Sequence, residues 1–497
     1  MWAVALLVAG TLAVPAPAHH ERFDLQAHRG GLGLRVENTL ASFGNALQLG
    51  VSTLELDVQI TEDGQAVVTH DRRVSAAKCA DTGPVVAGDP EFPYVGRYVN
   101  TLSLAQVRTL DCGSRPLADR PGQRAVPGAR MPLLSEVFAL VKRYRADGVT
   151  LNVETKVEAG APAETAPREQ FVRVTAAEIR RAGLLRQVTI QSFDWGALRL
   201  MRRVEPRLPL VALCNYDFLQ VGQPGASPWL GGLDIDDFGG DPIAAITSFG
   251  AGTYSPVHGF PQNGTVDHPA YRPYVTAAMV RHAHAHGVKV VPWTVDDLPT
   301  LGKLLDDGVD GIITDYPDRL RSLLAQRGHA LPRRYASPFD IQARAGSAAA
   351  ATEALRDPAV STLVVDAPLV AAVVPVLRPD VRLAVEVGSR PVARSVARRV
   401  RHVRAAVRSS DPAVLRLVHA LDPRIETVAV LDRPGPCLRF ADTVSPDAAV
   451  VRCGPRVVPY GADDPATMQR LVDLGAGGLV TRDPGALVEV AIRNGLR

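Results

Sequence analysis

The chain has 497 residues, of which 46% are hydrophobic and 22% are charged, and its formal net charge is +3 at pH 7. This length exceeds that of one ordinary compact domain and predicts at least two. The near balance of acidic and basic residues excludes the strongly basic surface of nucleic-acid-binding proteins, so no nucleic-acid partner is expected. No segment approaches the ~20 consecutive apolar residues that a transmembrane helix needs, so no transmembrane segment is expected.

The N-terminus has the pattern of an export signal. Residues 3–14 form a short apolar run, and Ala-Pro-Ala at 16–18 gives a small-x-small cleavage pattern before His19. These features predict a signal peptide over residues 1–18 and a secreted or extracytoplasmic protein. No Lys or Arg precedes the apolar run, and the alternative is a buried first strand or helix.

The five cysteines fit an oxidising compartment. Cys79 and Cys112 flank one loop-rich stretch, and Cys437 and Cys453 flank another, which predicts two local disulfide bonds. Cys214 lies in the apolar run PLVALCN and is expected to be a buried free thiol.

Short β-branched runs alternate with amphipathic stretches that end at glycine, which predicts a parallel sheet with crossover helices. At this length the pattern favours a (β/α)8 barrel, a TIM barrel, over residues 19–330, with a doubly wound open sheet as the alternative. Polar residues at the ends of the runs favour the barrel, because barrel enzymes assemble their active sites there. Residues 72–131, rich in Gly, Pro and Arg, are expected to form an inserted loop at the rim. The eight predicted strands are 22–30, 52–60, 149–156, 187–193, 209–215, 252–257, 288–295 and 310–317.

The polar residues at these strand ends form a chemically coherent set. Glu55 and Asp57 lie two positions apart on one strand, so their side chains share a face, and Glu154 lies on the next parallel strand. Three carboxylates in one barrel mouth repel each other unless a cation holds them, and hard oxygen ligands favour Ca²⁺ or Mg²⁺. His28 and His70 add candidates for acid and base catalysis near neutral pH.

Several segments, in order, resemble the glycerophosphodiester phosphodiesterase (GDPD) family. They are AHRGG followed by VENTLASFGNALQLGVSTLELDVQITEDGQAVVTHD, then LNVETK, VVPWTVDD and GVDGIITDYPD, which together span about residues 24–322. Val36 departs from the family pattern, which has Pro there, and this change concerns loop stiffness.

The resemblance implies a barrel enzyme that hydrolyses glycerophosphodiesters to glycerol 3-phosphate and an alcohol. It also implies a role for each site residue. The acid and base are His28 and His70; the metal ligands are Glu55, Asp57 and Glu154; the phosphate-binding cations are Arg29 and Lys156; the supporting residues are Glu37 and Asn38; and Trp293 is a wall of the substrate site.

The C-terminal third repeats the pattern of the first part. FDIQARAG, starting at Phe339, matches FDLQAHRG, starting at Phe23, and RLAVEVG matches TLNVETK. The longest match is ungapped, with Tyr460 lying 167 residues after Trp293. Ordered matches of this kind predict an internal duplication over residues 337–497.

The predicted copy lacks the chemistry of the first. Arg344 stands at the position of His28, and Val364 stands at that of Glu55, whereas Asp366 is retained. The copy is therefore expected to be a smaller, degenerate and catalytically inactive GDPD-like domain.

Two other functions remain open from the sequence. A lysophospholipase D or sphingomyelinase-D-like enzyme would use the same metal site on a lipid head group, and apolar rim residues such as Phe92, Tyr94 and Tyr98 are compatible with it. Such an enzyme would contact lipid or the cell envelope peripherally. The alternative from another class is a non-catalytic barrel that serves as a binding module.

Overall fold

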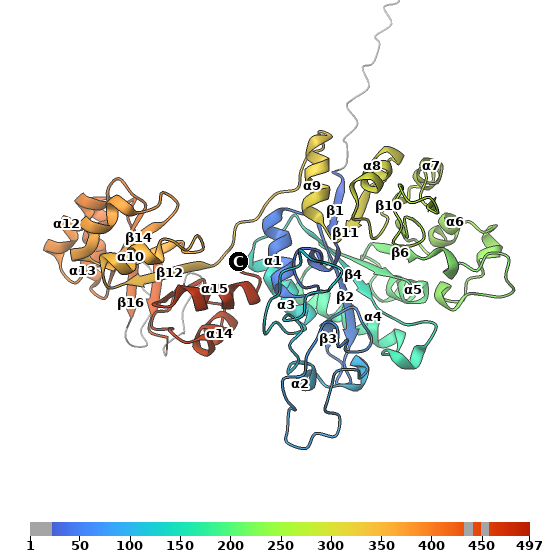
Figure 1. The fold of residues 1–497 in the computed structure, drawn as a ribbon, viewed down its shortest axis with the longest axis horizontal. Coiled ribbons are helices and arrows are strands. Elements are labelled where there is room, and N and C mark those ends of the chain that lie inside the picture. The colour runs from blue at the N-terminus through green and yellow to red at the C-terminus, as the bar shows by residue number, and fades with distance from the viewer. Residues whose placement is uncertain (1–21, 432–440, 449–456) are drawn as a thin grey trace, which may run out of the picture.

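The computed structural model describes residues 22–431, 441–448 and 457–497. These residues form two parallel sheets covered by helices, which Figure 1 shows side by side. The predicted signal peptide, 1–18, and the predicted Cys437–Cys453 bond lie outside the described residues. Both stay predictions.

The first sheet is a barrel of eight parallel strands in the order β10-β7-β6-β5-β4-β2-β1-β11. Its two ends meet where the Asp310 amide donates to the Val290 carbonyl (2.9 Å) and the Ile313 amide donates to the Pro292 carbonyl (3.0 Å). The strands are β1 (Asp24–Ala27), β2 (Thr53–Ile60), β4 (Thr150–Thr155), β5 (Val188–Ser192), β6 (Leu210–Cys214), β7 (Thr253–Pro256), β10 (Lys289–Val290) and β11 (Gly311–Thr314). Each of the eight predicted runs contains one of these strands, so the predicted TIM barrel is confirmed.

Helices surround the barrel because each crossover returns the chain to the same end of the sheet. Helix α1 shows how their limits are set: Thr39 caps its first turn, and Gly50 ends it with a φ of 87°. The helices of this part are α1 (Leu40–Leu49), α2 (Leu104–Val107), α3 (Leu134–Arg143), α4 (Arg168–Ala182), α5 (Trp195–Val204), α6 (Pro242–Thr247), α7 (Ala277–Ala285), α8 (Leu298–Asp307) and α9 (Pro317–Gln326). Across the described ranges of the chain, every helix is too short or too polar to cross a bilayer.

Three short strands lie outside the barrel ring. β3 (Ala66–Val68) pairs antiparallel with β2 and leads to His70, while β8 (Gly259–Phe260) and β9 (Arg272–Pro273) form a small hairpin. The eight strands predicted from the sequence did not include these three.

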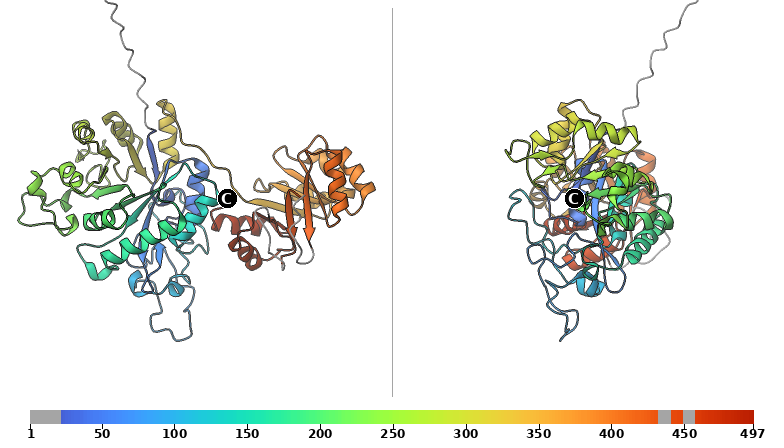
Figure 2. Two further views of the ribbon diagram at one scale, coloured as in Figure 1. Left: turned by 180° about the vertical axis from the view of Figure 1, so that it is seen from behind. Right: turned by 90° about the vertical axis from the view of Figure 1, so that its right-hand side faces the viewer.

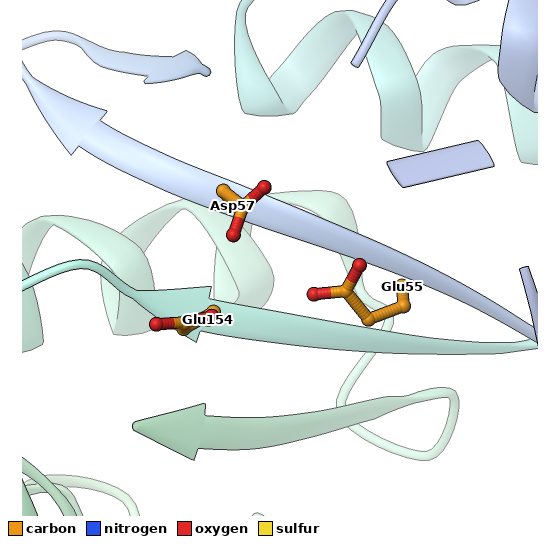
Figure 3. A group of neighbouring side chains, drawn as sticks. All are labelled: Glu55, Asp57 and Glu154. Atoms are coloured by element: carbon orange, nitrogen blue, oxygen red, sulfur yellow. The ribbon is translucent and has the colours of Figure 1, made fainter. Parts of the chain in front are cut away.

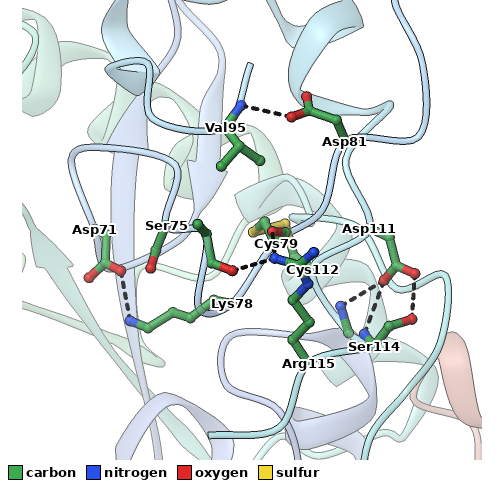
Figure 4. The surroundings of a disulfide bond; sticks show 12 residues. Asp71, Ser75, Lys78, Cys79, Asp81, Val95, Asp111, Cys112, Ser114 and Arg115 are labelled. Carbon is green, nitrogen blue, oxygen red and sulfur yellow. Dashed lines mark hydrogen bonds and ion pairs between the residues drawn. A yellow bond between two sulfur atoms is a disulfide. The ribbon is translucent and has the colours of Figure 1, made fainter. Parts of the chain in front are cut away.

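Residues 72–131 form an excursion with its own small core, which includes the fully buried Tyr94. Cys79 and Cys112 are joined by a disulfide bond across it, and Cys214 is a buried free thiol, as predicted (Figure 4). The bond fixes an excursion that has little regular structure of its own, apart from the one-turn helix α2.

Loss of this disulfide is expected to destabilise the protein. Cys79→Ser with Cys112→Ser frees a loop whose ends are 33 residues apart, and bonds of this kind are worth about 2–4 kcal/mol. Thermal unfolding should therefore begin at a lower temperature than in the wild type, and reduction should lower the Tm of the wild type by more than that of the double variant. Equal Tm values for the reduced and oxidised wild type would contradict this expectation.

The second sheet has seven parallel strands in the order β17-β16-β15-β14-β13-β12-β18. Tyr460 forms single bridges with both edges, to Asp447 and to Val480, so the sheet curves until its two edges are joined through this residue. Its strands are β12 (Asp340–Ala345), β13 (Thr362–Asp366), β14 (Arg382–Glu386), β15 (Ala405–Ser409), β16 (Glu426–Leu431), β17 (Thr443–Pro446) and β18 (Gly478–Thr481). Its helices are α10 (Ala348–Ala354), α11 (Val370–Val373), α12 (Arg390–Val400), α13 (Pro412–Leu421), α14 (Pro465–Asp473) and α15 (Pro484–Arg493).

The two sheets share strand register in their first strands. Asp24 pairs with Gly311 at the start of β1, and Asp340 pairs with Gly478 at the start of β12. Both aspartates accept hydrogen bonds from a Ser-Thr pair at the start of the next strand. For Asp24 these bonds are 2.9 Å and 2.6 Å, and for Asp340 they are 2.7 Å and 2.9 Å.

The chain end packs on the barrel. The Tyr144 hydroxyl, after α3, donates to the Gly495 carbonyl at 2.7 Å, and a Cβ at Gly44 of α1 would lie 2.0 Å from that same oxygen. The view from behind also shows α15 next to the barrel (Figure 2, left). Glycine at position 44 is therefore required for this close approach.

Candidate active site

A cavity of about 1000 Å³ opens at the carboxyl ends of the first barrel's strands. One side is charged and the other aromatic. The predicted site residues that line it are His28, Arg29, Glu55, His70, Glu154, Lys156 and Trp293. The structure thus brings together side chains that are as much as 265 positions apart in the sequence.

Three carboxylates lie together at this cavity, and two of them, Glu55 and Glu154, line it. Oxygens of Glu55 and Asp57, on β2, and of Glu154, on β4, all lie within 4.8 Å of one another (Figure 3). They come together because Asp57 and Glu154 are direct partners in the parallel register of the two strands. All three side chains are buried, with 5% exposure or less.

The pKa values of these three carboxyl groups are shifted because the groups are buried and close to one another. Burial, together with the charge of Asp57, raises the pKa of Glu55 to about 8 and that of Glu154 to about 7. The pKa of Asp57 is lowered despite its burial, because Arg29 and other cations lie close. A buried set of hard oxygen donors that resists full ionisation on its own is suited to a divalent cation such as Ca²⁺ or Mg²⁺.

Two cations lie beside the carboxylates. The Lys156 Nζ lies 2.9 Å from Glu154 Oε1 and 3.7 Å from Asp57 Oδ1. The Arg29 Nε lies 3.2 Å from Asp57 Oδ2, and the Arg29 backbone N–H donates to Glu55 Oε2 at 2.8 Å. Burial alone would lower the pKa of Lys156, but Glu154 and Asp57 raise it overall, so Lys156 carries a positive charge into the cavity.

The segment before α1 supports these groups. The Arg29 Nη1 donates to Glu37 Oε1 at 3.1 Å, and the Asn38 Nδ2 donates to Asp57 Oδ2 at 2.8 Å. Both Arg29 and Asn38 have a positive φ, 51° and 54°, which is uncommon for residues other than glycine and concentrates at functional sites. Within the described part of the chain, the buried Glu37 Oε2 and Asn38 Oδ1 have no hydrogen-bond partner, so both remain available as acceptors.

His28 is linked through Asp315 to Arg120. Its Nδ1 lies 2.6 Å from Asp315 Oδ1, and the Arg120 Nη2, from the excursion, lies 3.0 Å from Asp315 Oδ2. Burial and the charge of Arg29 lower the pKa of His28, but the hydrogen bond and charge of Asp315 outweigh them and raise it. With Nδ1 engaged, Nε2 is the ring nitrogen left to face the cavity.

His70 has a similar partner but the opposite pKa shift. Its Nδ1 lies 2.7 Å from Asp71 Oδ1, while Lys78 bridges Asp71 (2.8 Å) and Glu37 (2.9 Å). Burial, with the charges of Arg29 and Lys156, lowers the pKa of His70 to about 4. At neutral pH, His70 is therefore a neutral base, whereas His28 holds its proton more tightly than a free imidazole.

The opposite wall of the cavity is aromatic. The Trp293 indole N–H donates to the Ser255 carbonyl at 2.9 Å, which fixes the ring, and its centroid lies 5.3 Å from that of Phe193. Phe218 and Trp229 stack at 4.3 Å beside Phe193 and line the same cavity. The predicted position of Trp293 as a wall of the cavity agrees with this geometry.

Several residues of the site were not predicted as site residues from the sequence. The most informative is Asp315, because it follows the end of β11, and polar residues at strand ends were the signal used for the others. Gln191 of β5, which donates to Glu55 Oε1 at 2.7 Å, carries the same signal. Arg120 and Lys78 carry none, because they lie in the irregular excursion.

Comparisons with known proteins match the barrel part of the chain. The sequence model of the glycerophosphoryl diester phosphodiesterase family matches residues 28–319. A glycerophosphodiester phosphodiesterase of Caldanaerobacter subterraneus is 28% identical over 302 residues, covering 61% of this chain and 98% of its own length. A glycerophosphodiester phosphodiesterase of Bacillus subtilis is 27% identical over 307 residues, covering 60% of this chain and 85% of its own.

The fold has a solved counterpart. A crystal structure from Silicibacter pomeroyi, assigned as a glycerophosphoryl diester phosphodiesterase, superposes with a TM-score of 0.50 at 30% identity. The superposition covers 61% of this chain and 94% of that one. The barrel and these matches define a phosphoric diester hydrolase. The chain belongs to the glycerophosphoryl diester phosphodiesterase family.

Proposed function

We propose that the protein is an exported, divalent-metal-dependent glycerophosphodiester phosphodiesterase that releases glycerol 3-phosphate and an alcohol. The observation that carries this proposal is the buried group of Glu55, Asp57 and Glu154 between the cations Arg29 and Lys156. A divalent cation held by the three carboxylates supplies charge neutralisation for a phosphodiester. Arg29 and Lys156 add positive charge for the non-bridging oxygens, as the transition state requires.

The two histidines divide the proton transfers. His70, neutral above about pH 4, accepts a proton from the attacking water as the water oxygen bonds to phosphorus. His28, whose proton Asp315 helps to hold, donates it to the alcohol oxygen as the P–O bond to that alcohol breaks. His70 gains one proton and His28 loses one, so proton exchange with water returns both histidines to their starting states.

Asp315 is expected to set the alkaline limit of activity. In Asp315→Asn the pKa of His28 falls, because the group that raises it loses its charge. The acid form of His28 is then lost at a lower pH, and the alkaline limb of the pH–rate profile should move to lower pH. Asp296→Asn, which removes another carboxyl near Asp315, is the control variant whose pH–rate profile is compared with that of Asp315→Asn. An unchanged alkaline limb in Asp315→Asn would assign the acid role to another group.

The direct test is product release from a panel of head groups. Purified protein with Ca²⁺ or Mg²⁺ should release glycerol 3-phosphate from glycerophosphodiesters, and excess EDTA should stop the reaction. Failure to release glycerol 3-phosphate from any member of the panel would overturn the proposed function.

The aromatic wall supports a second candidate, a lysophospholipase-D-like activity on a lipid head group. Phe193, Phe218, Trp229 and Trp293 give the cavity an apolar side that a small polar substrate does not require. Lysophospholipids belong in the same panel, and faster turnover of these than of glycerophosphodiesters would favour this second candidate.

Export is supported by the disulfide bond, because such bonds persist in oxidising compartments. Sequencing of the N-terminus of protein recovered from outside the cytoplasm should find His19 as the first residue. Protein retained in the cytoplasm with residues 1–18 intact would contradict export.

An internal duplication is supported by details of the two sheets. Asp296 accepts from the Thr314 hydroxyl (3.1 Å) and the Asp315 amide (2.8 Å). Asp463 accepts from the Thr481 hydroxyl and the Arg482 amide at the same two distances. The domain over 337–497 is accordingly proposed to be a degenerate GDPD-like domain without hydrolytic activity, following the catalytic domain over 19–330.

A further inference from the structure

A second cavity, of about 300 Å³, lies at the carboxyl ends of the strands of the second sheet. Its position in that sheet corresponds to the position of the catalytic cavity in the first. It is lined by Arg344, Glu386, Val430, Tyr460, Gly461, Asp463, Val480, Thr481 and Arg482.

At three corresponding register positions, the second sheet has an arginine where the catalytic barrel has another residue type. Glu154 pairs with Gln191 in the first sheet, and Glu386 pairs with Arg408 at the corresponding place in the second. By the same comparison of registers, Arg344 takes the place of His28, and Arg482 takes the place of Asp315. The second site has therefore gained three guanidinium groups.

These guanidinium groups neutralise the carboxylates that remain. The Arg344 side chain lies 3.2 Å from both Asp366 Oδ1 and Glu386 Oε1, and the Arg408 Nε donates to Glu386 Oε1 at 2.8 Å. In the catalytic site the corresponding carboxylates, Asp57 and Glu154, crowd against a third. Two carboxylates bound to guanidinium groups need no metal ion, so the second cavity is not suited to the chemistry of the first.

Hydrogen-bond donors are left over around this cavity. Arg408 is 1% exposed, and its Nη1 has no hydrogen-bond partner among the residues that the structure describes, although its Nη2 donates to Ser445 Oγ at 2.9 Å. A buried guanidinium N–H without an acceptor is costly, so this atom favours a bound acceptor. The Arg408 guanidinium contacts Glu386, which lines the cavity and also binds Arg344, whereas Arg408 itself lies outside the cavity lining.

Arg482 provides donors from the other side. Its side chain is 79% exposed and comes no nearer to Asp463 than 3.9 Å. Asp463 uses its Oδ1 for the Thr481 hydroxyl and for the Arg482 backbone N–H. The guanidinium of Arg482 is therefore held only weakly and can turn toward an anion in the cavity.

We propose that this second cavity binds a phosphate group, as inorganic phosphate or as a small phosphate monoester, without hydrolysing it. Arg344 of β12 and Arg482 after β18 line the cavity, and Arg408 of β15 contacts the lining residue Glu386, so several guanidinium N–H groups gather here, which suits the oxygens of a phosphate group. The cavity volume is at the lower end for small-molecule sites and fits a ligand of this size. This binding function does not depend on the proposed hydrolase function.

The test is calorimetric titration of the full chain with inorganic phosphate, in EDTA. All variants carry Lys156→Ala, which weakens phosphate binding at the catalytic cavity. In this background, Arg344→Ala with Arg482→Ala is expected to weaken phosphate binding at least about 10-fold, because charge-assisted hydrogen bonds are lost. The matched control is Arg356→Ala with Arg424→Ala, two arginines of the same domain that are 72% and 77% exposed and lie outside the cavity lining.

The outcomes separate the possibilities. Equal phosphate affinity in the two double variants, or no measurable binding in the Lys156→Ala chain, overturns the proposal. Binding of acetate as tight as that of phosphate overturns the choice of a tetrahedral anion. If the double variant does not fold, the single variant Arg482→Gln, changed at an exposed side chain, replaces it in the test. The same loss of phosphate affinity is expected. In the chain with Lys156 intact, the double change should leave kcat/KM for hydrolysis unchanged, so a failure of the hydrolase proposal is recognised separately.

Discussion

Glu55→Gln is expected to abolish hydrolysis while leaving the protein folded. The change removes one of three carboxylates whose oxygens lie within 4.8 Å of one another, and a divalent cation needs their combined charge. It also preserves the size of the side chain and an acceptor oxygen for the Arg29 backbone N–H. Release of glycerol 3-phosphate and bound metal should fall together, whereas the Tm without added metal should change little.

A matched pair of variants gives the control. Asp57→Asn should remove activity, whereas Asp366→Asn, at the corresponding register position of the second sheet, should leave it intact. A chain with both Glu55→Gln and Asp57→Asn should show no residual hydrolysis, because the second domain is proposed to be inactive. Full activity of the wild type in excess chelator, or residual activity of the double variant, would contradict these assignments.

His28→Ala and His70→Ala are each expected to reduce kcat by about 10²–10⁴-fold, the usual contribution of a general acid or base. Both residues line the cavity, and each has its Nδ1 bound to a carboxylate, at 2.6 Å and 2.7 Å. KM should change less than kcat, because proton transfer matters in the transition state.

The pH dependence distinguishes the two histidines. Activity should rise as His70 loses its proton, and fall at higher pH as His28 loses its own. His402→Ala, an exposed histidine of the second domain, serves as the control and should retain wild-type kcat. Near-wild-type turnover in either His28→Ala or His70→Ala would leave that histidine with a structural role alone.

Much of the fold was predictable because its signals are local. Each of the eight predicted runs contains a strand of the barrel, since alternating apolar runs and glycine-ended helices repeat along residues 22–330. Polar residues of these strands, such as Glu55, Asp57 and Glu154, were predicted for the same reason. Their side-chain direction follows from the two-residue period of a strand, and the mouth of a barrel is where strand ends meet.

The sequence by itself determined the family, the barrel, the carboxylate group and the pairing of Cys79 with Cys112. The tertiary structure alone decided which groups the catalytic side chains contact. Asp315 reaches His28 across 287 positions of sequence, and Arg120 reaches Asp315 across 195, because barrel closure and the disulfide-linked excursion bring them together. The opposite pKa shifts of His28 and His70 follow from those contacts. Burial and the direction of neighbouring charges set such shifts, and neither is present in a linear pattern of residues.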